Sequence, residues 1–277
     1  MALAPLFRWF GDVFANVVVL AVFCEEPSMT PLLVITGASR GIGRAIAERG
    51  LERGLAVAAI ARTEADLASL AALRSDRVEV IVADVCDQAT LAAGVATAVE
   101  RFGPPTLVVA AAGTLGPIDR PWLLDGAALA DALAVTVTGT ANLAAATVPA
   151  MRDAGQGTFV AISASSASRV FPGWAAYGAA KAGLDAYVRY LAEETADVPG
   201  ITAFSFVPGL TDTAMQAGLR AVSAEQFPQV DQFRRWHDRG VAKQPALVAE
   251  ALELALALPH DELHGSIVEA DQLLKRR

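Results

Sequence analysis

Short, nearly continuous apolar runs alternate with longer amphipathic stretches along most of this chain. The runs 56–61, 78–83 and 107–112 contain almost no polar residue, which is typical of strands covered by helices on both faces. The stretches between them are rich in alanine and have helical periodicity. We therefore predict strands near residues 32–36, 55–60, 78–83, 106–110, 157–163, 200–206 and 264–269.

Strands that alternate with helices predict βαβ crossovers and a parallel sheet. The fold class that follows is α/β, a Rossmann-type doubly wound sheet of about seven mainly parallel strands with helices on both faces. The chain has 277 residues, of which 54% are hydrophobic, enough for the core of one such domain over residues 31–277. The alternation is less regular at 211–244, where we predict a substrate-side helical insertion. Either a mobile lid or a packed helical excursion fits this stretch.

Residues 1–30 differ from the rest in composition. The segment 13–23 is largely apolar, but it is too short to span a bilayer and no A-x-A cleavage site follows it. We interpret residues 1–30 as an upstream extension, with Met29 beginning the compact domain. A peripheral helix that contacts a membrane is the alternative.

The net charge of −8 and the pI near 4.9 argue against a nucleic-acid partner. Cys24 and Cys86 lie far apart, and the three histidines lack carboxylate or cysteine partners at metal-ligand spacing. We therefore expect no disulfide framework and no metal site. A reducing cytoplasm is the expected compartment, and a membrane is not favoured.

A glycine-rich turn follows the first predicted strand. Residues 36–43 read Thr-Gly-Ala-Ser-Arg-Gly-Ile-Gly and open a helical stretch. Glycines are needed where a strand turns sharply into a helix whose free N-terminal amides face an anion, because Cβ atoms would block the approach. Gly37, Gly41 and Gly43 fit those places, so the turn predicts a nucleotide-phosphate site.

Tyr177 and Lys181 stand four residues apart in a predicted helix over 175–195, so their side chains share one face. A neighbouring ammonium favours the phenolate form of a tyrosine. We expect it to bring the hydroxyl closer to a useful acid or base near neutral pH.

With these motifs in order and spacing, residues 32–270 resemble the short-chain dehydrogenase/reductase family, most closely its sepiapterin and benzil reductase group. The resemblance implies that Tyr177 donates a proton to a carbonyl oxygen while a nicotinamide delivers hydride, and that Lys181 lowers the tyrosine pKa and holds the ribose. The positions expected to bind the cofactor are Gly37, Ser39, Arg40, Gly41, Ile42, Gly43, Arg62, Asp84, Val85, Ala112, Gly113, Tyr177, Lys181, Pro208, Gly209, Thr211 and Thr213.

Three positions depart from the family pattern. Ala111 stands in the motif that usually reads Asn-Asn-Ala-Gly, Thr136 stands where a relay asparagine is usual, and Ala164 stands where a catalytic serine is usual. A one-residue bulge would present Ser165 in place of that serine, so we take Ser165 as the third catalytic candidate. In the alternative, the nearby serines only satisfy a strand-end loop.

Charge decides the cofactor form. The second predicted strand ends before Arg62 rather than before an acid, and Arg40 lies in the glycine turn. Both guanidinium groups suit a 2′-phosphate, which favours NADP(H), with NAD(H) as the alternative. Either arginine also fits an ordinary surface position.

Three residues are substrate-binding candidates: Trp174 and Met215, which indicate an apolar carbonyl compound, and Glu269, which lies where sepiapterin reductases grip a pterin with an acid. The predicted function is NADPH-dependent reduction of a small apolar ketone or diketone. The alternative is a non-catalytic nucleotide-binding member of the fold that acts through a protein partner. The family resemblance implies a homo-oligomer, a dimer or a tetramer, and the long alanine-rich helices 127–152 and 176–195 suit pairing across a two-fold axis. In the alternative, these helices only cover the sheet.

Overall fold

A single parallel sheet of seven strands organises residues 30–276, which are the residues that the computed structural model describes. Residues 1–29 of the predicted extension over 1–30 lie outside them. The strand order is β3-β2-β1-β4-β5-β6-β7, and every pairing is parallel. The strands are β1 (Leu32–Thr36), β2 (Ala56–Ala61), β3 (Val78–Val82), β4 (Pro105–Ala110), β5 (Gly157–Ile162), β6 (Ile201–Val207) and β7 (Ile267–Glu269). The predicted fold class is confirmed.

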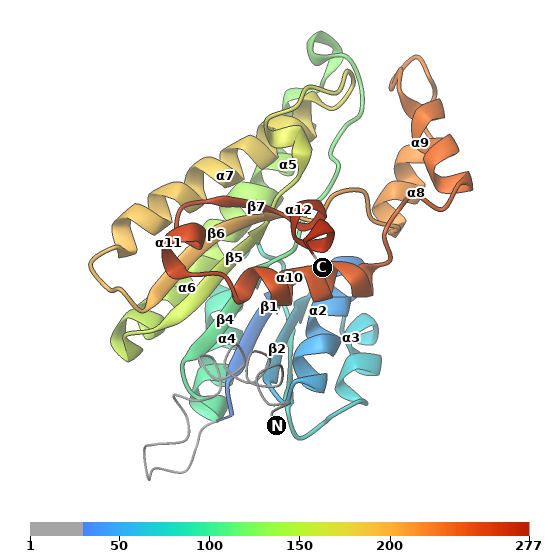
Figure 1. Cartoon of the computed structure of the whole chain (residues 1–277). Coiled ribbons are helices and arrows are strands. Elements are labelled where there is room, and N and C mark those ends of the chain that lie inside the picture. Colours follow the sequence, from blue (N-terminus) through green and yellow to red (C-terminus); the bar gives the residue numbers. More distant parts are fainter. Residues whose placement is uncertain (1–29, 277) are drawn as a thin grey trace, which may run out of the picture.

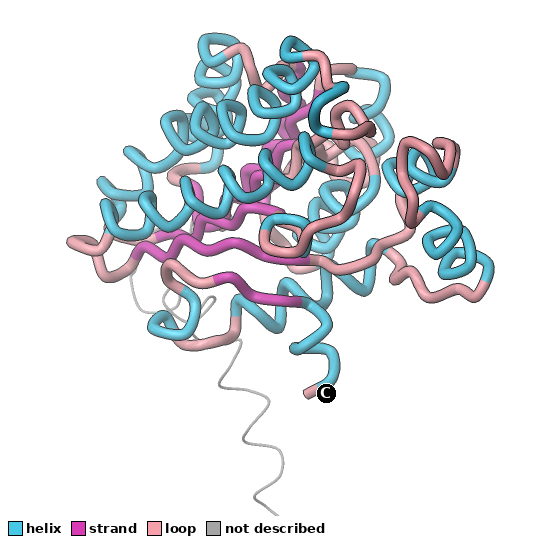
Figure 2. The backbone as a smooth tube through the Cα atoms, turned by 90° about the horizontal axis from the view of Figure 1, so that it is seen from above, coloured by secondary structure: helices cyan, strands magenta, loops and turns pink. Residues whose placement is uncertain are grey.

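Helices cover both faces of the sheet (Figures 1 and 2). They are α2 (Gly41–Glu52), α3 (Glu64–Ala71), α4 (Gln88–Phe102), α5 (Gly126–Leu133), α6 (Gly139–Ala154), α7 (Ala175–Thr195), α8 (Ala214–Arg220), α9 (Val230–Asp238), α10 (Pro245–Leu256), α11 (His260–Leu263) and α12 (Ala270–Lys275). One core lies between the sheet and α2, α3, α10 and α12, and the other lies between the sheet and α4, α6 and α7.

The sheet has its switch point between β1 and β4. The chain runs outward from β1 to β3 and then returns to place β4 on the other side of β1. Ligands bind at such a point in open α/β sheets, beyond the carboxyl ends of the strands. The loops that follow β1 and β4 therefore frame the candidate site.

Residues 211–244 form the predicted helical insertion, and α8 and α9 project beyond the sheet (Figure 1). Phe227, Val230 and Phe233 are buried in a small core of their own. The structure thus shows the packed helical excursion. Phe227, Phe233 and Trp236 of this insertion pack with Phe171 and Trp174, which precede α7, and we call these five rings the aromatic cluster.

One continuous helical stretch, Gly126–Ala154, is long and apolar enough to cross a membrane by length and composition. It comprises α5, a π-helical turn over Ala134–Thr138, and α6. Leu143 and Met151 on α6 are fully buried in the second core. The α6 part of this stretch therefore packs against the sheet.

Candidate active site

The glycine turn joins β1 to α2 with very little room for side chains. Gly37 and Gly41 have φ values of 66° and 59°, which side-chain-bearing residues rarely adopt. A Cβ on Gly37 would lie 3.0 Å from the backbone of Ala111, and a Cβ on Gly43 would overlap the Gly37 carbonyl oxygen. The first turn of α2 contains no acidic residue and its N-cap makes no side-chain bond. The cradle thus fits an anion such as a dinucleotide phosphate.

Thr36 fixes the loop after β4 against the end of β1. Its Oγ1 accepts hydrogen bonds from the Ala111 and Ala112 amides at 3.1 and 3.2 Å. The side chain is buried. The sequence analysis placed Thr36 at the strand end and in the glycine turn but assigned it no contact, although a polar residue that closes an apolar strand was a signal for one. Ala111 makes the contact through its backbone, so the loss of asparagine there does not remove it.

The next predicted residues lie in the glycine turn, at the start of α2 and directly after β2. Ser39 and Ile42 are half-buried, whereas Arg40 and Arg62 are exposed. Within residues 30–276, neither arginine forms an ion pair or a hydrogen bond through its side chain. Both guanidinium groups are therefore free to meet a phosphate.

Asp84 and Val85 shape the loop after β3. Asp84 Oδ1 accepts a hydrogen bond from the Cys86 amide at 2.9 Å. Val85 is buried, and its carbonyl oxygen accepts a hydrogen bond at 2.8 Å from Nδ2 of the buried Asn142 on α6. The sequence analysis did not identify Asn142. A polar amide side chain in an alanine-rich helical stretch was the signal that could have pointed to it.

Lys181 lies on the buried face of α7 and reaches the end of β5. Its Nζ donates a hydrogen bond to the Ile162 carbonyl oxygen at 2.6 Å and lies 5.9 Å from the centroid of the Tyr177 ring. A Cβ on Gly113 would lie 3.6 Å from the same Nζ. Lys181 Nζ thus lies between the Tyr177 ring and the glycine after β4, two positions that come from separate motifs of the sequence.

The pKa values of this pair differ from the expectation. Burial raises the pKa of Tyr177 to about 12, rather than the lysine lowering it. Burial also lowers the pKa of Lys181 to about 8, against an opposing effect of the Asp185 carboxylate. The predicted direction for Tyr177 is therefore wrong in this structure, because desolvation of the phenolate outweighs the ammonium, which bonds to Ile162.

The serines after β5 do not follow the predicted bulge. The β5–β6 ladder is regular up to Ile162, and the Ser163 amide continues it to Phe206. A 3-10 turn then begins at Ser165, whose side chain is exposed, whereas Ser163 and Ser166 are buried. The bulge is therefore a wrong prediction. Ser165 stays a catalytic candidate because, of these three serines, it is the one open to a ligand.

Thr136 lies in the π-helical turn before α6 and is fully buried. Its carbonyl oxygen accepts a hydrogen bond from Thr140 Oγ1 at 2.7 Å, while its own hydroxyl has no partner among the described residues. Single π-helical turns occur frequently at functional sites. Thr136 therefore combines a π-helical backbone with a buried hydroxyl, unpartnered within residues 30–276, at the position where the family usually has an asparagine.

The turn after β6 closes the site from the side of α8. Pro208 is buried, and Thr211 Oγ1 donates to the Gly209 carbonyl oxygen at 3.2 Å. Thr213 caps α8, and its methyl group would lie 3.4 Å from a Cβ on Gly41. The turn therefore packs against the glycine cradle.

An ion pair that sequence reasoning missed lies over this turn. Lys243 Nζ pairs with Asp271 at the start of α12, and a Cβ on Gly209 would lie 2.7 Å from that Nζ. Gly209 has a φ of 71°, so both its conformation and its surroundings require glycine. No sequence signal connected these two charges, because they lie on separate elements.

The substrate-binding candidates occupy different environments. Trp174 is 6% exposed; it stacks on Phe227 at 5.1 Å and meets the Tyr177 ring edge-on at 5.3 Å between centroids. Met215 is half-buried on α8. Glu269 is exposed at the end of β7 and accepts a hydrogen bond from Gln272. Trp174 is thus packed among other aromatic rings, and it also contacts Tyr177.

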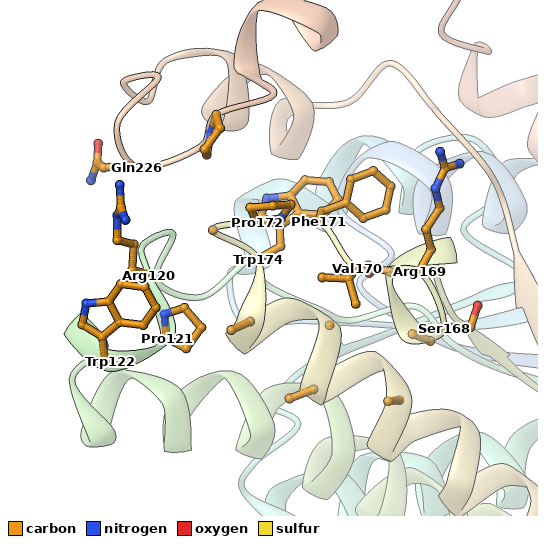
Figure 3. A pocket seen from close by; sticks show the side chains of 18 of the residues that line it. Arg120, Pro121, Trp122, Ser168, Arg169, Val170, Phe171, Pro172, Trp174 and Gln226 are labelled. Carbon is orange, nitrogen blue, oxygen red and sulfur yellow. The ribbon is translucent and has the colours of Figure 1, made fainter.

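A groove of about 650 Å³ is lined in part by Trp174 (Figure 3). It is lined by Arg120, Trp122, Val170, Phe171 and residues of the outer face of α7, while Tyr177 and Lys181 do not line it. Trp174 therefore separates this groove from the tyrosine.

Comparisons with known proteins agree with this geometry. Residues 31–223 match the family model described as short chain dehydrogenase. A benzil reductase ((S)-benzoin forming) of Bacillus subtilis (strain 168) is 33% identical over 230 residues, covering 80% of this chain and 91% of that protein.

Two solved structures are also similar. The YIR035C short chain dehydrogenases/reductase from Saccharomyces cerevisiae superposes with a TM-score of 0.81 at 27% identity, over 88% of this chain and 98% of its own. The KRED1-Pglu enzyme superposes with a TM-score of 0.80 at 29% identity, over 86% of this chain and 100% of its own. The chain therefore belongs to the short-chain dehydrogenase/reductase family of oxidoreductases, close to its benzil reductases.

Proposed function

We propose that this protein is an NADPH-dependent reductase of small apolar ketones or diketones. The observation that carries the proposal is the placement of the half-buried Tyr177 and the buried Lys181 on one face of α7, with the lysine beside Gly113 at the carboxyl edge of the sheet. The similarity to benzil reductase supports an aromatic diketone as the substrate class.

The cradle residues fit a dinucleotide. Gly37, Gly41 and Gly43 leave backbone amides open at the start of α2, and Thr213 closes the space from the opposite side. When bound there, a nicotinamide supplies the hydride. Arg40 and Arg62, unpaired within the described residues, support a 2′-phosphate and hence NADPH.

Tyr177 is the proton donor in this proposal. Burial raises its pKa to about 12, so the phenol is protonated throughout the neutral range and is ready to give a hydrogen bond to a carbonyl oxygen. Lys181 holds a positive charge beside the tyrosine ring, which favours the phenolate as the proton leaves. Trp174 and its aromatic cluster exclude water from one side of the tyrosine.

Consumption of NADPH by the purified protein tests the proposal, with a panel of aromatic diketones, quinones and sepiapterin. Tyr177→Phe removes the donated proton, and we expect it to lower kcat by about 10²–10⁴ while NADPH still binds. Tyr190→Phe is the matched control, because Tyr190 lies on the same helix and is 73% exposed. NADPH binding without turnover of any compound would favour the non-catalytic alternative, to which the alanine at position 164 and the threonine at position 136 also point.

A further inference from the structure

A second charged side chain lies on the buried face of α7, one helical turn beyond Lys181. Asp185 is 5% exposed, as is Lys181. Positions four apart on a helix share one face. Asp185 therefore belongs to the interior of the molecule, where aspartate is rarely found unless it is compensated.

The surroundings of Asp185 do not supply that compensation by a direct bond. Its Oδ1 is buried and has no hydrogen-bond partner among the described residues. Within the same residues, no arginine, lysine or histidine pairs with its carboxylate at ion-pair distance. Such a group costs stability unless a charge nearby offsets it.

Lys181 also lacks a direct ion pair within the described residues. Its ammonium has three N–H donors, and one of them bonds to the Ile162 carbonyl oxygen on β5. Gly113, from the loop after β4, is its other close neighbour, and neither residue has a titratable side chain. Among residues 30–276, the titratable groups that face Lys181 are Tyr177 and Asp185, both on its own helix. Of these two, Asp185 carries the carboxyl group, the side chain that can offset an ammonium.

From this placement we infer that Asp185 is a positioning residue that keeps the Lys181 ammonium charged beside Tyr177. The two opposite charges on one buried face stabilise each other through space, without a direct ion pair. The direction of the lysine pKa agrees with this, since burial lowers it and the Asp185 carboxylate raises it. The consequence for catalysis rests on the proposed reductase function, but the charge state of Lys181 does not.

Lysine NMR tests the inference directly, because the chain contains only three lysines, Lys181, Lys243 and Lys275. With lysine labelled with ¹³C at Cε, each ammonium titrates as a separate resonance, and Lys181→Met assigns one of them. We expect a midpoint near 8 for Lys181 in the unchanged protein. In Asp185→Asn the midpoint should fall by about one unit or more, and in Asp185→Glu it should stay near its original value.

Lys243 and Lys275 are internal controls and should not move. A Lys181 midpoint that is the same in Asp185→Asn as in the unchanged protein would overturn the inference. So would an ordinary midpoint of about 10.4 in the unchanged protein. Asp185→Ser is a second neutral variant that fits the same space if the asparagine variant does not fold.

Turnover gives the second measurement. If Lys181 must be charged, the alkaline limb of kcat against pH should move to lower pH in Asp185→Asn, by the shift found by NMR, with KM for the ketone unchanged. A shift in the lysine midpoint in a protein that reduces no ketone would leave the inference standing and reject the proposed function. A fall in kcat that is equal at every pH, with no NMR shift, would show a merely structural effect.

Discussion

Gly43 lies directly against Gly37, so that a Cβ on Gly43 would overlap the Gly37 carbonyl oxygen. Gly37 in turn touches the backbone of the loop after β4. The first turn of α2, the glycine turn and that loop are thus packed backbone against backbone. A single added methyl group has no room to move aside there.

Gly43→Ala should therefore damage both the fold and the dinucleotide site. Overpacking of this kind costs about 1–3 kcal/mol in the free energy of unfolding, and we expect NADPH affinity to fall at least tenfold. Urea unfolding and quenching of tryptophan fluorescence by NADPH measure the two effects. Gly218→Ala on α8 is the control, because nothing lies within 4 Å of its Cβ position. Equal behaviour of the two variants would contradict the packing argument.

Arg40 and Arg62 should set the preference for NADPH. Alanine at either position removes a charged hydrogen-bond donor to the 2′-phosphate, so KM for NADPH should rise about tenfold or more while KM for NADH stays the same. Arg74→Ala is the control, since that exposed arginine is already paired with Asp76. Parallel changes for both cofactors, or a preference for NADH in the unchanged protein, would refute the assignment.

Phe227 should hold the insertion in place. It is fully buried and stacked on Trp174, so Phe227→Ala should cost about 3–5 kcal/mol, mostly within the small core around α8 and α9. Limited proteolysis with trypsin measures this, since Arg220 and Arg234 lie in the insertion. We expect Phe227→Ala to be cleaved faster in the insertion than the control Val241→Ala, which alters an exposed side chain of the same insertion. Equal cleavage rates would count against a packed insertion.

Lys181 should make stability depend on pH in a defined window. Its pKa is lowered from 10.5 to about 8 in the folded protein. Between those values the unfolded chain binds more protons than the folded chain, so this group makes the free energy of unfolding rise with pH. Below pH 8 both states are protonated, and above 10.5 both are neutral.

Comparison with Lys181→Met isolates this effect. The difference in unfolding free energy, variant minus unchanged protein, should fall by about 2 kcal/mol between pH 8 and pH 10. Urea titrations at both pH values measure it. Lys275→Met should show no such change, because Lys275 is exposed near the C-terminus. A constant difference for Lys181→Met would mean that its ammonium is not desolvated.

The sequence anticipated those parts of the site that follow from local geometry. The helix predicted over 175–195 is α7, Ala175–Thr195, and the spacing of Tyr177 and Lys181 places both on one face. The glycine turn likewise needs only neighbours in sequence, since a strand, a sharp turn and a helix are consecutive. These predictions depend on backbone conformation, which nearby residues determine.

Contacts between distant segments were not predictable in the same way. The ion pair between Lys243 and Asp271 over Gly209, and the support of Val85 by Asn142, each join elements far apart in the chain. The stacking of Trp174 on Phe227 is another such contact, and it decided that the tryptophan is packed in a cluster. No periodicity carries information about such partners.

The amino-acid sequence by itself determined the order of strands and helices, the glycine turn and the shared face of Tyr177 and Lys181, because apolar periodicity and glycine stereochemistry act over a few residues. Only the tertiary structure decided how deeply these groups are buried. Burial raises the pKa of Tyr177, lowers that of Lys181 and leaves Asp185 facing the interior. Desolvation depends on every element packed around a charge, and so it appears only when the whole sheet and its helices are assembled.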